Sequence, residues 1–346
     1  MEKKRIGVLT GGGDCPGLNP AIRGIVMRAL DYGDEVIGLK YGWAGLLKAD
    51  AVPLTLEMVE NILEEGGTIL GSSRTNPFKK EEDVQKCIEN FKKLNLDALI
   101  AIGGEDTLGV ASKFSKLGLP MIGIPKTIDK DLEETDYTLG FDTAVEVVVD
   151  AIKRLRDTAK SHARVIVVEI MGRHAGWLAL YGGLAGGADY IFIPEVEPHL
   201  NELYDHIRKL YDRGHNYAVV AIAEGAQLPG FTYQKGQEGM VDAFGHIRLG
   251  GVGNVLAEEI QKNIGVETRA VILSHLQRGG TPSIRDRILG LQLGKEGVDL
   301  VHEGKSGYFI AVKGSQLVPV DITLIEGKTK TVDPAFYESM KTFFNK

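Results

Sequence analysis

The sequence predicts an α/β protein with mostly parallel sheets, covered by helices on both faces. Two observations support this prediction. Short apolar runs rich in β-branched residues alternate with helical patterns along nearly the whole chain, which is the order of parallel strands joined by crossover helices. Glycine-rich and acidic turns follow several of these runs, at the position where open α/β sheets place their ligand sites.

The apolar runs have the length and composition of buried parallel strands. They are residues 5–10, 35–39, 98–102, 121–124, 164–170, 190–193, 217–223, 269–273 and 308–312. Helical periodicity lies between most of them, over residues 21–32, 81–94, 143–160, 199–213, 252–263 and 284–303. Thr107 precedes a further helical run and is a candidate N-cap. The stretch 227–251 is irregular and rich in glycine, so it reads as a long loop or an inserted hairpin.

Length and charge limit the classes of function. A chain of 346 residues favours two domains. Its 40 basic and 47 acidic residues give a net charge of -7, which disfavours nucleic acid or an anionic membrane as a partner. Only Cys15 and Cys87 are present, without His or Cys at metal-ligand spacing. Together with an amino terminus that resembles neither a signal peptide nor a membrane span, this predicts a cytoplasmic protein without a structural disulfide.

Two acidic clusters follow consecutive predicted strands. The first is GGEDT at residues 103–107, and the second is PKTIDKD at residues 125–131. Together they supply four carboxylates, hydroxyls and lysine ammonium groups at one edge of a sheet. That mixture suits phosphoryl transfer, in which a metal and cations screen phosphate charge while a carboxylate accepts a proton. Each cluster alone could simply end a strand and cap a helix; two of them favour a site for an anionic ligand.

Three glycine-containing turns extend this prediction. Residues 11–17 follow the first strand and precede a helix, so their backbone amides could approach an anion. Residues 71–75 place Arg74 in a glycine-serine turn, where its forked donors could bridge phosphate oxygens. Residues 274–280 put His275 and Arg278 after another strand. Taken alone, residues 11–17 indicate phosphate only weakly, and an exposed arginine in a polar loop explains Arg74 about as well. A lone histidine at a strand end, such as His275, is more often structural.

Taken together, the motifs resemble the phosphofructokinase family along nearly the whole chain. The matching segments, in family order, are GVLTGGGDCPGLNPAIRG, GGTILGSSRT, IGGEDT, PKTIDKD, TDYTLGFDTA, SHARVIVVEIMGRHAG, IAEG and ILSHLQRGG. The resemblance implies two Rossmann-like three-layer α/β/α domains that face each other. The donor-binding domain would comprise residues 1–140 and 277–326, and the domain that binds fructose 6-phosphate would comprise residues 141–276 and 327–346.

The resemblance also implies roles for the acidic clusters and the glycine turns. Asp129 matches the base that deprotonates the sugar 1-hydroxyl, and Thr127 matches a hydroxyl that contacts the transferred group. Glu105 and Asp131 match acidic positions near Mg²⁺, the implied cofactor. Donor-phosphate contacts are implied for Gly11, Gly12 and Arg74, and Arg74 would also steady the transferring group.

The sugar-phosphate site is implied by a larger set of positions. They are Thr127, Asp129, Arg164, Met171, Gly172, Arg173, Glu224, Arg269, His275 and Arg278. In the family, the equivalents of Arg164 and Arg269 reach into the site of a neighbouring subunit, so a homodimer or homotetramer is expected.

The phosphoryl donor is where the chain departs from ATP-dependent bacterial relatives, which usually read GGDGS and PGTIDND. Asp106 and Lys126 each replace a glycine, and this pair resembles the pyrophosphate-dependent, mixed-substrate members of the family. The sequence therefore predicts reversible, Mg²⁺-dependent transfer from pyrophosphate to fructose 6-phosphate. An ATP-dependent kinase of the same fold is the alternative, and a sugar-phosphate sensor without catalysis is a third. Lys130 replaces the usual asparagine; it either lowers the pKa of Asp129 or points to solvent.

Overall fold

The computed structural model describes residues 2–230 and 250–344 and confirms the predicted α/β class. Most of the predicted 227–251 loop thus lies outside the described residues. The strands are β1 (Arg5–Thr10), β2 (Glu35–Leu39), β3 (Ala51–Leu54), β4 (Ala98–Gly103), β5 (Met121–Pro125), β6 (Val165–Ile170), β7 (Tyr190–Phe192), β8 (Ala218–Ala223), β9 (Thr268–Ile272), β10 (Tyr308–Lys313) and β11 (Gln316–Asp321).

Helices separate most of the strands. They are α1 (Leu18–Tyr32), α2 (Trp43–Lys48), α3 (Leu56–Val59), α4 (Glu81–Lys93), α5 (Glu105–Lys116), α6 (Phe141–His162), α7 (Trp177–Gly186), α8 (Leu200–Asp212), α9 (Val252–Ile264), α10 (Ile284–His302) and α11 (Pro334–Met340). Within the described ranges, no helix is both long enough and apolar enough to cross a membrane.

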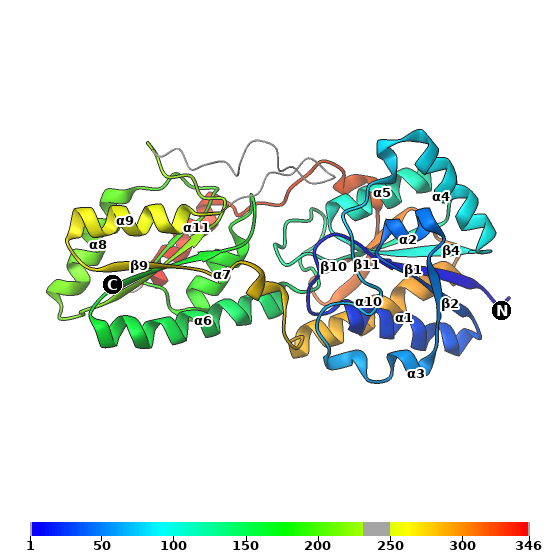
Figure 1. Ribbon diagram of the computed structural model, residues 1–346, viewed down its shortest axis with the longest axis horizontal. Helices are drawn as coiled ribbons and strands as arrows, with labels where there is room; N and C mark the ends of the chain where they lie inside the picture. Colours follow the sequence, from blue (N-terminus) through cyan, green and yellow to red (C-terminus); the bar gives the residue numbers. More distant parts are fainter. Residues whose placement is uncertain (1, 231–249, 345–346) are drawn as a thin grey trace.

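The strands form two sheets in separate lobes (Figure 1). The first has the order β11-β10-β5-β4-β1-β2-β3, and its central strands are parallel. The second has the order β7-β8-β6-β9 and is parallel throughout. Helices α1 and α10 cover one face of the first sheet, and α2, α4 and α5 lie on the other.

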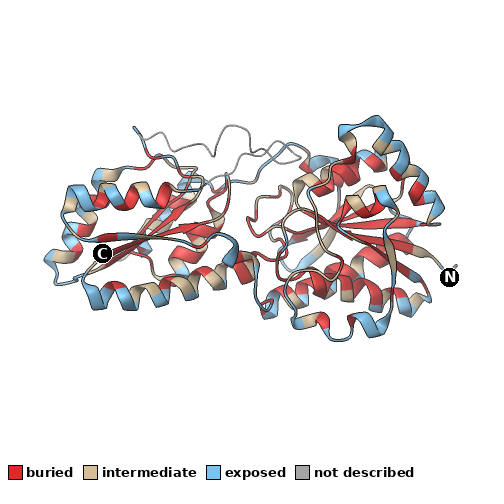
Figure 2. Ribbon diagram, in the orientation of Figure 1, coloured by how far each residue is buried: buried red, intermediate tan, exposed pale blue. Residues whose placement is uncertain are grey.

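The chain passes between the lobes more than once. Helix α6 leads from the first sheet to the second, α10 returns to the first, and α11 ends beside the second (Figure 1). The division of the strands between the two sheets agrees with this path. The predicted domain boundaries at residues 140, 276 and 326 remain a prediction. Figure 2 shows that the buried residues concentrate in the strands and on the helix faces that cover them. Buried runs such as the whole of β4, β6 and β8 are typical of parallel strands covered on both faces.

Two details of the sequence prediction were incomplete or wrong. Strands β3 and β11 were not predicted; both pair antiparallel at the edges of the first sheet. Thr107 is not an N-cap, because α5 begins at Glu105 after Gly104. Its side chain is buried instead against the glycine turn that follows β1, where a Cβ added at Gly11 would lie 2.5 Å from Thr107 Oγ1.

Candidate active site

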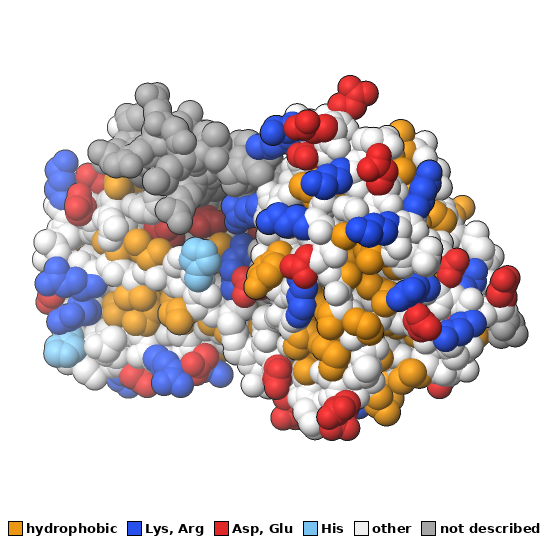
Figure 3. Space-filling view, turned by 45° about the vertical axis from the view of Figure 1, so that its right-hand side comes forward, with side chains coloured by type: hydrophobic (Ala, Val, Ile, Leu, Met, Phe, Trp, Pro, Cys, Tyr) orange, Lys and Arg blue, Asp and Glu red, His pale blue; other side chains and the backbone are white. Residues whose placement is uncertain are grey.

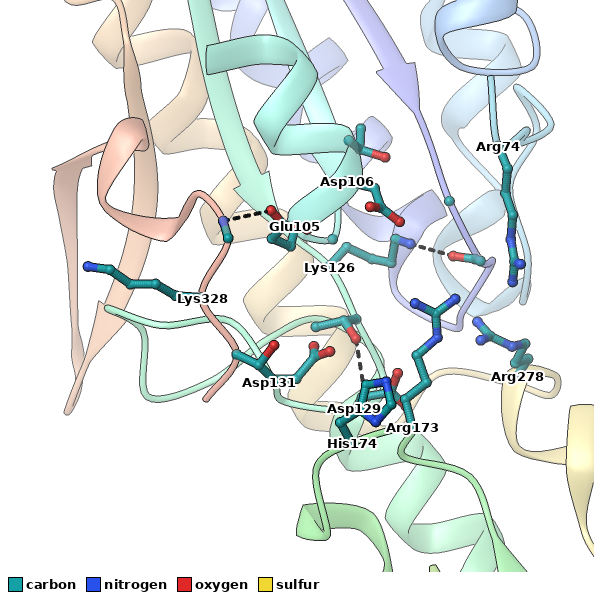
Figure 4. A pocket seen from close by; sticks show the side chains of 17 residues that line it. Arg74, Glu105, Asp106, Lys126, Asp129, Asp131, Arg173, His174, Arg278 and Lys328 are labelled. Carbon is teal, nitrogen blue, oxygen red and sulfur yellow. Dashed lines mark hydrogen bonds between the residues drawn. The ribbon is translucent and has the colours of Figure 1, made fainter. Parts of the chain in front are cut away.

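A cavity of about 250 Å³ lies where the carboxyl ends of the first sheet face the second lobe (Figure 4). It is lined by Gly12, Gly13, Arg74, Gly104, Glu105, Asp106, Thr107, Lys126, Thr127, Asp129, Asp131, Arg173, His174, Arg278, Gly327, Lys328 and Thr329. The segments after β1, β4 and β5 supply much of this lining, and the segments after β6 and β9 supply Arg173, His174 and Arg278. The structure therefore brings together both predicted acidic clusters and most of the predicted turns.

Lys126 is a buried cation held at the glycine turn. It is 3% exposed, and its Nζ donates a hydrogen bond to the carbonyl of Gly13. Burial lowers the pKa of Lys126, because the charged form loses solvation. Gly12 has a φ of 79°, a conformation that favours glycine. A positive charge fixed beside open backbone amides is an arrangement suited to a compact anion.

Arginines gather on one side of the cavity. Figure 4 shows the guanidinium groups of Arg74, Arg173 and Arg278 close to one another, near Lys126. Arg74 and Arg278 also line an adjoining hollow with His275, so His275 lies beside the cavity and not in it. Such a cluster can hold phosphate oxygens through several charge-assisted hydrogen bonds.

Asp129 has the surroundings expected of a general base. It is 6% exposed, and its backbone N–H donates to Thr127 Oγ1 at 3.1 Å. Its Oδ1 is buried and accepts no hydrogen bond from any residue that the structure describes. Burial raises the pKa of Asp129, while Arg278, Arg173 and Lys126 oppose that shift. A carboxylate that is poorly solvated, with an oxygen available, can accept a proton from a bound hydroxyl.

Glu105 and Asp131 lie on the opposite side of the cavity from the arginines (Figure 4). Glu105 Oε1 accepts a hydrogen bond from Gly327 N at 3.0 Å. Burial and the neighbouring Asp129 raise the pKa of Asp131. No group of three or more potential metal-ligating side chains occurs among the described residues. Mg²⁺ needs only one or two carboxylates because it retains water and binds substrate phosphate. A cation at Asp131 would also relieve its repulsion with Asp129. Glu105 and Asp131 therefore fit this ion.

The second lobe contributes a braced turn to the predicted sugar side. Glu224 Oε1 accepts hydrogen bonds from the backbone N–H groups of Gly172 (3.3 Å) and Arg173 (3.1 Å). The N–H of Met171 donates to Gln277 Oε1 at 3.3 Å. Burial raises the pKa of Glu224, with a further contribution from Asp129. These bonds fix the turn after β6 that directs Arg173 into the cavity.

Arg164 and Arg269 are not brought to this cavity. Arg164 directly precedes β6, and Arg269 lies near the start of β9, so both are at the amino ends of their strands. They make ion pairs of 3.4 Å and 2.8 Å with Glu267. The cavity opens at the carboxyl ends of the strands. Both arginines therefore lie at the opposite ends of these strands from the cavity.

Sequence reasoning missed four residues that line the cavity, His174, Gly327, Lys328 and Thr329. Lys328 and Thr329 belong to a segment between β11 and α11 that returns across the site. It is anchored at Glu105 through Gly327 and at the carbonyl of Asp131 through the N–H of Lys330, at 2.8 Å. The apolar stretch before it, residues 317–325, contains Pro319 and was not predicted as a strand, so no predicted strand end pointed to this segment. His174 lay within a quoted segment but had no assigned role.

Glycine turns, cations and carboxylates around one cavity between two α/β lobes are typical of phosphoryl-transfer enzymes. The chain belongs to the phosphofructokinase family: the family model described as "Phosphofructokinase" matches residues 5–301. This confirms the resemblance that the sequence motifs indicated.

Individual relatives extend over the whole chain. It is 91% identical over 346 residues, 100% of both chains, to a protein of Dictyoglomus thermophilum named pyrophosphate–fructose 6-phosphate 1-phosphotransferase. It is 46% identical to a Streptomyces coelicolor protein named ATP-dependent 6-phosphofructokinase 3, over 96% of this chain and 98% of that one. The solved phosphofructokinase of Saccharomyces cerevisiae superposes with a TM-score of 0.82 at 29% identity, over 99% of this chain and 47% of that longer chain.

Proposed function

We propose that this chain is a pyrophosphate-dependent phosphofructokinase. It transfers a phosphoryl group reversibly from pyrophosphate to the 1-hydroxyl of fructose 6-phosphate and gives fructose 1,6-bisphosphate and phosphate, a step of glycolysis. The observation that carries the choice of donor is the placement of Lys126 and Asp106 in one cavity with the glycine turn. The name of the relative at 91% identity supports the same donor.

Charge explains why this pair favours pyrophosphate. A unit charge about 4 Å from a phosphate is worth on the order of 4 kcal/mol at an effective dielectric near 20. The carboxylate of Asp106 should therefore repel an additional nucleotide phosphate where relatives have glycine. Lys126 offers a fixed cation to a small, dense anion. Their combined effect is large enough to change donor preference by orders of magnitude.

We assign the chemistry to residues on both sides of the cavity. Asp129 accepts the proton of the sugar 1-hydroxyl, while Thr127 and Arg74 steady the transferred group. Gly11 and Gly12 present backbone to the donor. Glu105 and Asp131 hold Mg²⁺, which supplies charge neutralisation to the phosphates when bound. The sugar phosphate is held by Met171, Gly172, Arg173, Glu224, His275 and Arg278, and by Arg164 and Arg269 from a neighbouring subunit.

A homo-oligomer follows from this assignment, because Arg164 and Arg269 lie outside the cavity of their own chain. Exposed apolar side chains are compatible with contacts between subunits. Ile284 is 74% exposed and Leu276 is 71% exposed, and Figure 3 shows hydrophobic side chains gathered on one face of the first lobe.

Cys15 and Cys87 are free and buried. Thiols that stay reduced suit the cytoplasm, which we propose as the compartment.

ATP-dependent transfer is the second candidate, since the relative at 46% identity carries that activity in its name. A comparison of donors with purified protein decides between them. We expect fructose 1,6-bisphosphate to form with pyrophosphate and Mg²⁺ at a rate at least 100-fold above that with ATP, and phosphate to drive the reverse reaction. Turnover with ATP and none with pyrophosphate would overturn the proposal. Binding of fructose 6-phosphate without turnover of either donor would instead indicate a sensor.

A further inference from the structure

The side chain of Lys130 points neither to solvent nor into the phosphate cavity. It is 8% exposed. Its Nζ lies over four aromatic rings, at 4.6 Å from the centroid of Trp177, 4.7 Å from Tyr181, 5.3 Å from Phe141 and 5.7 Å from Tyr137. All four distances fall within the range of cation–π attraction, which is about 6 Å. Of the two alternatives for Lys130, the one in which it points to solvent is therefore wrong.

The four rings, which we call the aromatic cage, form one continuous wall. Phe141 packs edge-on against Tyr137 and Tyr181, with centroids 5.5 Å apart in both pairs. Trp177 packs against Tyr181 at 6.1 Å, and its indole Nε1 donates to the carbonyl of Lys330 at 3.0 Å. Because each ring contacts another, the cage is a rigid receptor for the ammonium group.

The cage joins the two lobes at the reacting group. Trp177 and Tyr181 stand one turn apart on α7 of the second lobe, whereas Lys130 belongs to the segment after β5 of the first. Lys330 reinforces the same junction, because its N–H donates to the carbonyl of Asp131 while its own carbonyl accepts from Trp177. The backbone directly after Lys130 is therefore linked to α7 through Lys330.

The backbone at Lys130 adopts a conformation that needs support from its surroundings. Its φ is 55°, in the left-handed region that lysine rarely adopts. Such conformations persist where the surrounding structure enforces them. Asparagine adopts this region more readily than lysine does. A lysine here needs a compensating interaction, and the contacts of its ammonium group with the cage provide one.

We propose that Lys130 is a positioning residue that uses the aromatic cage to hold Asp129 in its reactive orientation. This inference rests on the proposed function, with Asp129 as the base. Of the two carboxylate oxygens of Asp129, Oδ1 has no hydrogen-bond partner in the described part of the chain, so anchoring of the backbone contributes to the direction of the carboxylate. A displacement of about 1 Å at a reacting group can cost on the order of 100-fold in rate.

The test compares Lys130→Met, which keeps an apolar stem without charge, with Lys130→Arg, which keeps the charge. We expect Lys130→Met to lower kcat about 10- to 100-fold in both directions of the reaction, with the KM values of both substrates within about threefold of wild type, because orientation and not binding is lost. If Lys130→Met lowers kcat about 100-fold, the kcat of Lys130→Arg should be at least tenfold higher than that of Lys130→Met. Lys153→Met, at an exposed lysine on α6, is the matched control and should match wild type.

A second variant keeps the proposal testable if Lys130→Met folds poorly. Tyr181→Leu removes one wall of the cage without touching the segment that carries Asp129. It should also lower kcat at nearly constant KM, and the double variant should lose no more than the worse single variant, since both act through one interaction. A kcat for Lys130→Met within twofold of wild type, or losses that multiply in the double variant, would overturn the proposal. Each assay uses whichever donor the wild type turns over, so a wrong donor assignment would be recognised separately.

Discussion

The two sides of the cavity differ in how many of their predicted residues lie at the cavity of this chain. On the donor side, Lys126, Asp106 and Glu105 line a common cavity, and Lys126 and Glu105 are held there by hydrogen bonds within the chain. On the sugar side, Glu224 and Arg173 are in place, but Arg164 and Arg269 are ion-paired with Glu267 at the far ends of their strands. Under the proposed function, the donor site forms within a single chain, whereas the sugar site is completed by a neighbour.

The largest effect is expected at Asp129, which serves both sides. Asp129→Asn removes the proton acceptor and keeps the size of the side chain. General-base catalysis typically contributes 10²- to 10⁴-fold, so kcat should fall about 10³-fold in both directions, with the KM for fructose 6-phosphate little changed. Steady-state kinetics measure this. Transfer by Asp129→Asn at near wild-type rate would show that another group accepts the proton.

Lys126 tests the donor side alone. Lys126→Met should lower kcat/KM for pyrophosphate about 100-fold, because a buried cation at the glycine turn is lost, while the KM for fructose 6-phosphate should stay within about threefold of wild type. Lys92→Met, at an exposed lysine of α4, is the control. If Lys126→Met raised both KM values equally, the two sides of the cavity could not be treated as separate sites.

Arg269 tests whether the sugar side needs a neighbour. Arg269→Ala should raise the KM for fructose 6-phosphate about tenfold and leave the KM for pyrophosphate unchanged, because a phosphate contact is lost without effect on the donor. The sharper measurement mixes Arg269→Ala subunits with Asp129→Asn subunits after reversible dissociation. Mixed oligomers should regain low-KM activity, since some sites then combine an intact Asp129 with an intact Arg269. No recovery in verified mixed oligomers would mean that Arg269 serves no neighbouring site.

The sequence predicted the central strands well because their runs are apolar and end in clear turns. It missed β3 and β11 because each contains a proline, Pro53 or Pro319, which argues against a central strand. Both are edge strands, where the missing N–H can be tolerated. The acidic clusters could be placed at one site because they follow neighbouring parallel strands. Lys328 could not be placed at this site from the sequence, because its position depends on tertiary contacts of a segment far along the chain. The surroundings of Lys130 depend on Tyr137, before α6, and on rings from α6 and α7, and no local pattern connects these rings to Lys130.

The smallest kinetic effect is expected at Asp286, a buried residue of α10 that binds the start of α6, the helix leading to the second lobe. Its carboxylate accepts hydrogen bonds from the N–H groups of Gly140 (3.0 Å) and Thr143 (2.9 Å), and from Thr143 Oγ1 (2.5 Å). In Asp286→Asn, the amide NH₂ group is a donor and faces at least one of these donors, which then loses its acceptor. The free energy of unfolding should therefore fall by about 1–3 kcal/mol.

Denaturant unfolding of Asp286→Asn and of Asp142→Asn measures this cost. Asp142 accepts from Tyr137 and Ser283 hydroxyls, which can rotate to suit an amide, so its variant should lose less stability. At temperatures well below unfolding, Asp286→Asn should keep the KM values for both substrates. Such a result would show that the donor and sugar sides differ through their own local contacts. It would also show that the contact of Asp286 with the start of α6 does not cause the difference. A selective rise in the KM for fructose 6-phosphate would instead mean that the position of the second lobe, set at Asp286, controls the sugar side.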